Sequence, residues 1–280
     1  MAGRSRTGEG ETLREAIAER VRDQDLGTGG GGELRARVLG CWIDAVTLDQ
    51  TVEIVEQAIT SRRPCQHVAI NAAKLVRFQN DEELRRVIRG CQLVTADGQA
   101  VVWAGRVLGQ PLPERVTGID LMHAVLERAG ERDYGVYVLG ARAEVLERAV
   151  RALGERYPSL RLVGARHGYF QADEEAAIVE SIREAAPDVL FVALETPAKE
   201  LFLARHRDQL QVPFVMGVGG AVDILGGVRR RAPRWMQRLG LEWAYRLAQD
   251  PRRLAGRYVV GNARFTWLVV REFVRERLGR

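Results

Sequence analysis

Short apolar runs rich in β-branched residues alternate along the chain with longer stretches of helical periodicity. Amphipathic stretches such as Ala143 to Tyr157 and Glu174 to Ala186 are long enough to be crossover helices. Alternation of this kind predicts an α/β fold, in which a parallel sheet carries helices on both faces. The runs indicate six strands, at residues 67–70, 92–96, 134–140, 161–165, 188–194 and 213–219.

The predicted strands are continuously apolar, as in the string VLFVAL at residues 189–194. Such runs fit strands that are buried on both faces, as in a Rossmann-like sheet. Ligands of these sheets bind outside the carboxyl ends of the strands. We therefore expect a binding site among the residues that follow the strands, which are Asn71, Asp97, Gly98, Gly140, Glu195, Gly217, Gly219 and Gly220.

The pattern divides the chain into three parts. Residues 1–36 are charged and end near the string GTGGGG, which predicts a flexible N-terminal segment. Residues 37–227 carry the alternation of strands and helices and form the predicted α/β core. The pattern then changes to two or three helices broken at Pro233 and Pro251, so residues 228–280 are expected to form a basic helical appendage.

The net charge of +5 is unevenly distributed. Residues 229–280 carry 14 arginines and four acidic residues, whereas the rest of the chain has more acidic than basic side chains. Aromatic residues lie among these arginines, and such segments suit anionic lipid headgroups or phosphates. A pair of solvated basic helices would have the same composition. The apolar rings favour a membrane surface over nucleic acid, because phosphate contacts alone need no apolar face.

Composition limits the possible cellular location of the protein and the kinds of site that it can form. No apolar run approaches the roughly 20 residues that span a bilayer, and the string MAGRSRTGEGETLRE has no apolar signal core, so we expect a cytoplasmic protein. The three cysteines form no CxxC pair and the four histidines are dispersed. Neither a disulfide framework nor a metal site is therefore predicted, and no cofactor is expected.

Two polar residues at strand ends are candidates for chemistry. The string TADGQAVVWAGRVLG (95–109) places Asp97 at the end of a buried strand, before Gly98 and an apolar helix. Its carboxylate either caps that helix or acts as a general base at the binding edge of the sheet. Asn71 ends another strand, and its side chain either holds a sugar hydroxyl or caps the helix that begins at Ala72.

Two further strings suit the binding of an anion. ERVTGIDLM (114–122) places Arg115 and Thr117 in a turn that opens a helix, where the arginine can contact a phosphate or form a surface salt bridge. GVGGAVDILGG (217–227) follows a strand, and its glycines allow a diphosphate to approach the backbone. Its spacing does not match G-x-G-x-x-G, which argues against an NAD-type oxidoreductase.

Seven features in this order resemble the WecG/TagA/CpsF glycosyltransferases, glycosyltransferase family 26, over about residues 37–265. Members attach sugars such as N-acetylmannosamine to undecaprenyl-diphosphate-linked acceptors. The features are Asn71, TADG around Asp97, ERVTGIDL, VLG at 138–140, YPSLRLVGARHGYF at 157–170, GVGGAVDILGG, and RAPRWMQRLGLEWAYRLAQDPRRLAGRY in the basic segment.

The resemblance implies an inverting transferase without an essential metal, which uses a UDP-sugar donor and a polyprenyl-diphosphate-linked glycan acceptor in cell-surface polysaccharide synthesis. Asp97 matches the proposed catalytic base, and the basic segment is expected to close over the site at the inner face of the cell membrane. The oligomeric state stays open, a homo-oligomer included. Donor and acceptor contacts are expected from Asn71, Arg115, Thr117, Gly140, Glu200, Gly217, Gly219 and Gly220, and diphosphate contacts from Arg230, Arg231, Arg252, Arg253 and Arg257.

The chain departs from the family pattern at two places. The threonine that usually stands two residues before the asparagine is Ala69 here. The usual G-x-G-x-P-K-Q-E stretch reads ALETPAKE, with Ala193, Glu195, Ala198 and Lys199 at altered positions. These changes support an alternative interpretation, in which the chain is a non-catalytic protein that binds a sugar nucleotide or a lipid diphosphate.

Overall fold

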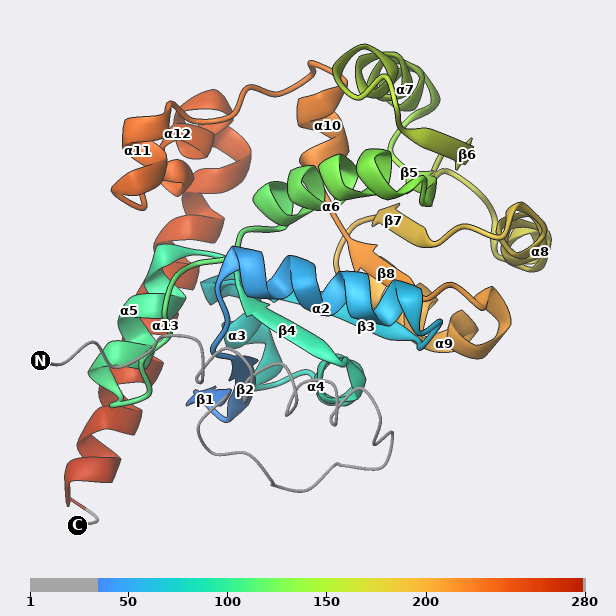
Figure 1. Cartoon of the computed structure of the whole chain (residues 1–280). Coiled ribbons are helices and arrows are strands. Elements are labelled where there is room, and N and C mark those ends of the chain that lie inside the picture. The colour runs from blue at the N-terminus through green and yellow to red at the C-terminus, as the bar shows by residue number, and fades with distance from the viewer. Residues whose placement is uncertain (1–34, 279–280) are drawn as a thin grey trace, which may run out of the picture.

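A computed structural model describes residues 35–278 of the chain, apart from the side chains of Arg238, Arg253, Leu254, Ala255 and Arg257. Its centre is a six-stranded sheet in the order β4-β3-β8-β7-β5-β6, with every neighbouring pair parallel (Figure 1). All six predicted strands are present and the predicted α/β class is confirmed. The strands are β3 (Cys65–Ile70), β4 (Leu93–Ala96), β5 (Gly135–Gly140), β6 (Arg161–Arg166), β7 (Val189–Ala193) and β8 (Phe214–Gly217).

A short antiparallel hairpin precedes the sheet and was not predicted. It pairs β1 (Arg35–Val38) with β2 (Cys41–Asp44), and β1 begins two residues before the predicted start of the core. Leu39 and Gly40 form its turn, both with positive φ, which matches the right-handed twist of two short strands. Leucine is an unusual residue for such a turn, so the sequence carries little signal for it.

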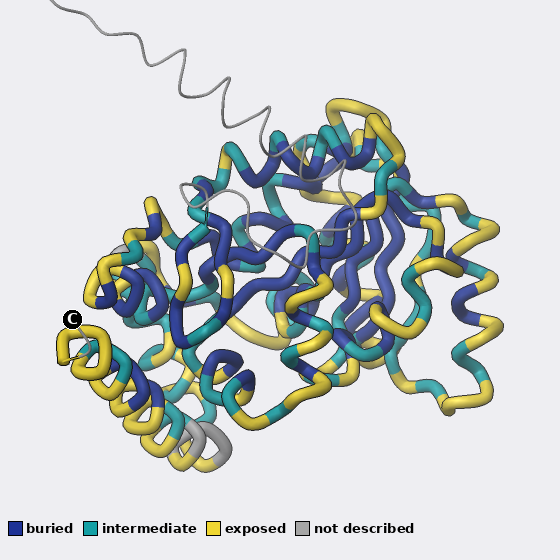
Figure 2. Tube along the Cα trace, turned by 90° about the horizontal axis from the view of Figure 1, so that it is seen from below, coloured by how far each residue is buried: buried dark blue, intermediate teal, exposed yellow. Residues whose placement is uncertain are grey.

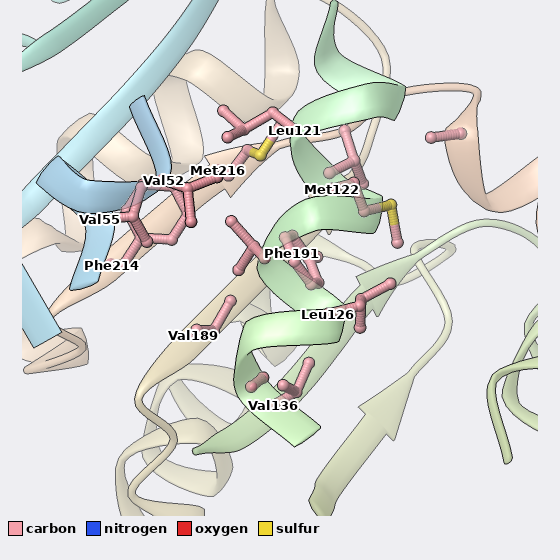
Figure 3. Packing of buried hydrophobic residues seen from close by; sticks show 14 of the residues in the cluster. Val52, Val55, Leu121, Met122, Leu126, Val136, Val189, Phe191, Phe214 and Met216 are labelled. Atoms are coloured by element: carbon pink, nitrogen blue, oxygen red, sulfur yellow. The ribbon is translucent and has the colours of Figure 1, made fainter. Parts of the chain in front are cut away.

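Helices cover both faces of the sheet because alternate strand residues point to opposite sides. On one face, apolar residues of β5, β7 and β8 pack against α2, α6, α7 and α10 (Figure 3). On the other face, the alternate residues of β5, β7 and β8 pack against α8 and α9. Residues of β3 and β4 on that face pack against α3, α4 and α5. These helices are α2 (Leu48–Thr60), α3 (Ala72–Phe78), α4 (Glu82–Gly90), α5 (Gln99–Val107), α6 (Gly118–Arg132), α7 (Ala143–Arg156), α8 (Glu175–Ala185), α9 (Ala198–Leu210) and α10 (Ala221–Leu225), and η1 (Ala172–Glu174) is a single 3₁₀ turn.

The neighbouring strands β3 and β8 send their following helices to opposite faces of the sheet. β3 leads into α3, which packs with α4 and α5, whereas β8 leads into α10, which packs with α6 and α7. Connections that diverge in this way open a crevice at the carboxyl ends of the two strands, where ligands of such sheets bind. The topology therefore favours the edge at which Asn71, Asp97 and Gly217 lie.

Three helices follow the sheet: α11 (Arg234–Arg238), α12 (Glu242–Gln249) and α13 (Pro251–Leu278). Their interpretation as an appendage is not confirmed, because Phe265, Leu268 and Val269 of α13 are buried in one cluster with residues of α3, α4 and α5. The other side of α13 is exposed (Figure 2). No helix within residues 35–278 is both long and apolar enough to cross a membrane.

Gly140 is expected to be intolerant of any side chain. Its φ is +131°, and a Cβ there would lie 2.5 Å from the carbonyl carbon and oxygen of Ala193 on the neighbouring strand. We expect Gly140→Ala to lower the free energy of unfolding by about 2 kcal/mol or more. Gly154 of α7 is the control, because a Cβ there meets nothing within 4 Å and Gly154→Ala should raise stability by about 0.5–1 kcal/mol. Urea unfolding of both variants checks the pair, and equal stabilities would contradict it.

Candidate active site

Asp97 lies at the carboxyl end of β4 and extends the pairing of β3 with β4, since its backbone N–H donates to the Ile70 carbonyl at 2.7 Å. The helix after it, α5, has Gly98 as its N-cap and no side-chain capping bond, so of the two roles that the sequence left open for Asp97 the structure does not support capping of this helix. The carboxylate instead accepts a hydrogen bond from the backbone N–H of Gly118, in the first turn of α6. A helix N-terminus thus orients the side chain.

The surroundings of Asp97 suit a proton acceptor. Burial raises the pKa of its carboxyl, and Glu242 of α12 acts in the same direction. Arg246 of α12 and Lys74 of α3 oppose the shift. The residue as a whole is half-buried at this edge of the sheet. A carboxylate whose pKa is raised toward neutral pH is a better general base than an ordinary surface aspartate.

Asn71 and Thr117 cap helices. Asn71 Oδ1 accepts from the backbone N–H of Lys74 at 3.0 Å, which is the capping role left open by the sequence. This bond leaves the NH₂ of the same amide free for another role. Thr117 is buried. Its hydroxyl accepts a hydrogen bond from the backbone N–H of Asp120 at 3.2 Å and donates one to the Asp120 carboxylate at 2.6 Å. Both residues therefore fix the start of a helix at the strand edge.

Two lysines and one glutamate form a buried ionic cluster beside Asp97. Lys74 Nζ lies 2.9 Å from Glu200 Oε1 and donates to the Ala69 carbonyl at 2.9 Å. Lys199 Nζ lies 3.5 Å from the same Glu200 oxygen and donates to Thr196 Oγ1 at 2.5 Å. Burial would raise the pKa of the Glu200 carboxyl, but the two ammonium groups lower it. We call Lys74, Lys199 and Glu200 the Lys-Glu-Lys cluster.

Arg115 and Arg231 attach α12 to the body of the protein. Arg115 Nη1 lies 2.6 Å from Glu242 Oε2, which is the salt bridge that the sequence left open against a phosphate contact. Arg231 holds Asp120 through both terminal nitrogens, at 2.7 and 2.8 Å, and its Nε lies 3.6 Å from Glu242 Oε1. We call Arg115, Arg231, Asp120 and Glu242 the arginine clamp. Arg246 lies one helical turn after Glu242, which brings its charge to Asp97.

Two of the other predicted arginines, Arg230 and Arg252, are not brought to Asp97. Arg230 exchanges backbone hydrogen bonds with the Gln249 side chain, and Arg252 is exposed at the start of α13. Neither is among the charges that act on Asp97. The side chains of Arg253 and Arg257 lie outside the described residues.

The four predicted glycines each have a different environment. Gly140 allows the close approach of β5 to β7, and Gly220 is the N-cap of α10. Gly219 adopts a left-handed conformation with φ of +50°. Gly217 lies beneath the Lys199 side chain. In residues 35–278, no group of three or more His, Cys, Asp or Glu side chains could hold a metal ion.

The chain is similar to known proteins of one family. A family described as "Glycosyl transferase WecG/TagA/CpsF family" matches residues 36–279. An N-acetylglucosaminyldiphosphoundecaprenol N-acetyl-beta-D-mannosaminyltransferase of Staphylococcus aureus strain MW2 is 32% identical over 219 residues, which are 78% of this chain and 85% of the relative. The same enzyme of strain NCTC 8325 / PS 47 has the same identity and coverage.

Proposed function

The chain belongs to the WecG/TagA/CpsF family and is a glycosyltransferase, and from this premise we propose that it moves N-acetylmannosamine or a related sugar from UDP to a polyprenyl-diphosphate-linked glycan. The acceptor follows from the relatives, whose name specifies N-acetylglucosaminyldiphosphoundecaprenol. The UDP donor follows from the family resemblance. The product would enter the synthesis of a cell-surface polysaccharide.

One observation supports the mechanism: Asp97, at the carboxyl edge of the sheet, has a carboxyl whose pKa is raised by burial. The acceptor hydroxyl gives its proton to Asp97 while its oxygen attacks the anomeric carbon of the donor. The bond from that carbon to the diphosphate oxygen breaks on the opposite side, so the configuration inverts. The Gly118 N–H keeps the carboxylate in position for the attack, and orientation of this kind supplies much of the rate.

The departing diphosphate needs cations, and Arg246 is the first candidate because it is exposed and acts on Asp97. Arg115 and Arg231 are bound to carboxylates, so their proposed role is to hold α12 and Arg246 in place. Arg230, Arg252, Arg253 and Arg257 remain proposed contacts. Asn71, Thr117, Gly140, Glu200 and the glycines at 217, 219 and 220 are proposed to shape the donor and acceptor sites.

Arg246→Met is expected to lower kcat/KM by about 10- to 100-fold, since a charge-assisted hydrogen bond contributes about 1.5–3 kcal/mol. Arg246 lowers the pKa of Asp97, so its loss raises that pKa further. The acid limb of the pH–rate profile should therefore move to higher pH. Arg148→Met on α7 is the charge-matched control and should leave the profile unchanged. An Arg246→Met profile that coincides with the wild-type profile would rule out this contact.

The proposed function is tested by measuring UDP release from a panel of UDP-sugars, with and without a short-chain polyprenyl-diphosphate N-acetylglucosamine. Release that requires the acceptor supports transfer. Tight binding of UDP-sugars without release would support the non-catalytic alternative, which the altered ALETPAKE stretch favours.

We further propose that the protein works at the inner face of the cell membrane. Trp235, Trp243 and Trp267 of the last three helices are exposed among arginines, a combination that suits an anionic lipid surface. Flotation with anionic liposomes, compared with duplex DNA binding at equal salt, tests this location. Binding to DNA but not to the liposomes would contradict it.

A further inference from the structure

Lys199 occupies the space that the first glycine of the 217–227 stretch leaves open. A Cβ on Gly217 would lie 2.8 Å from Lys199 Cδ and 3.0 Å from Cε, so the aliphatic chain of the lysine runs directly over this glycine. Its Nζ ends 3.8 Å from the position of a Cβ on Gly219. The sequence predicts that these glycines let a diphosphate approach the backbone. The structure places an ammonium group there.

Glu200 is shared between two lysines. Lys74 already neutralises Glu200 at 2.9 Å, whereas Lys199 stands 3.5 Å from the same oxygen. The Lys-Glu-Lys cluster thus holds two cations and one carboxylate, and Asp97 is the other anion whose charge reaches Lys199. An ammonium group has three donors, and Lys199 directs them to Thr196 and Glu200, which leaves capacity for one more acceptor.

We propose that Lys199 binds an anionic oxygen of the sugar nucleotide and thereby helps to determine which donor the enzyme accepts. This inference rests on the proposed function, because it places the donor at the carboxyl ends of β7 and β8. The anionic oxygen belongs either to the diphosphate or to a carboxylate on the transferred sugar. Both offer the same chemistry to a buried ammonium group at the carboxyl ends of β7 and β8.

Burial lowers the pKa of the Lys199 ammonium, and the carboxylate of Glu200 opposes this shift. Binding of an anion beside it would stabilise the charged form, so the bound donor and the charged lysine favour each other. The excess positive charge of the Lys-Glu-Lys cluster is then balanced in the complex.

Lys199→Met tests the proposal, because methionine keeps an unbranched chain over Gly217 and removes the ammonium group. Isothermal titration calorimetry would measure the Kd of three probes: UDP, a neutral UDP-N-acetylhexosamine, and the corresponding UDP-N-acetylhexosaminuronic acid. If the diphosphate is the partner, all three bind about tenfold or more weakly in the variant. If the sugar carboxylate is the partner, only the uronic acid donor loses that affinity. Lys199→Gln repeats the measurement should the methionine variant fail to fold.

Arg205→Gln is the matched control, because Arg205 lies on the same helix and pairs with Glu175 on the surface. Its three Kd values should stay within about twofold of wild type. Three unchanged Kd values in Lys199→Met would overturn the proposal. Binding needs no acceptor, so absence of sugar transfer by the wild-type protein would count against the proposed function alone.

Discussion

Asp97→Asn is expected to lower kcat by about 10²- to 10⁴-fold, the usual contribution of a positioned general base. Asparagine has nearly the same shape and still accepts the hydrogen bond from Gly118, but it cannot take a proton from the acceptor hydroxyl. The KM of the donor should change little because the charge contacts to the diphosphate are intact. Steady-state UDP release at saturating acceptor measures the effect. Asp49→Asn, an exposed change at the start of α2, is the control.

The same variant should be as stable as wild type or more stable at neutral pH. The pKa of Asp97 in the folded protein is raised above its unfolded value by burial, so between these two values the folded state binds more protons. The contribution of Asp97 to stability therefore falls as pH rises through this window, and the penalty is complete above it. Asparagine carries no such penalty.

Full turnover in a folded Asp97→Asn protein would remove Asp97 from the mechanism.

Lys74→Met is expected to lower the free energy of unfolding by about 3–5 kcal/mol. Lys74 and Glu200 are both buried, so removing the lysine leaves a buried carboxylate whose nearest remaining cation is Lys199, at 3.5 Å. The bond to the Ala69 carbonyl is lost as well. Urea unfolding followed by tryptophan fluorescence measures the loss.

Arg77→Ala on the same helix is the control for Lys74→Met. Arg77 pairs with Asp81 at the surface, where an ion pair contributes less than about 1 kcal/mol. The account of the Lys-Glu-Lys cluster requires a much larger loss for Lys74→Met than for Arg77→Ala. Similar losses would show that burial of this pair has little effect on stability.

The sheet could be predicted from the sequence because its strands are buried on both faces and read as unbroken apolar runs. The packing of α13 could have been found in the same way. Phe265, Leu268 and Val269 have the spacing of a buried helical face, but the many arginines around them gave the segment the composition of an exposed one. Charge content alone therefore obscured a part of the core.

The sequence predicted a site residue only where that residue directly follows a strand, because the strand then places it at the edge of the sheet. Asp97 follows a strand directly, so its place at the edge of the sheet followed from the strand itself. Lys74 and Arg246 lie within helices, and their sequence neighbours do not show that they approach Asp97. Arg115 binds Glu242, which lies 127 residues away in the chain, so local sequence could not distinguish this salt bridge from a phosphate contact.

The configuration of the product tests the central mechanism most directly. With an α-linked UDP-sugar as donor, a single displacement by an acceptor oxygen that Asp97 deprotonates must give a β-linked glycolipid. NMR of the purified product, from the one-bond coupling of the anomeric carbon to its hydrogen, identifies the linkage. We predict the β anomer. An α-linked product would contradict a single in-line displacement and the role assigned to Asp97.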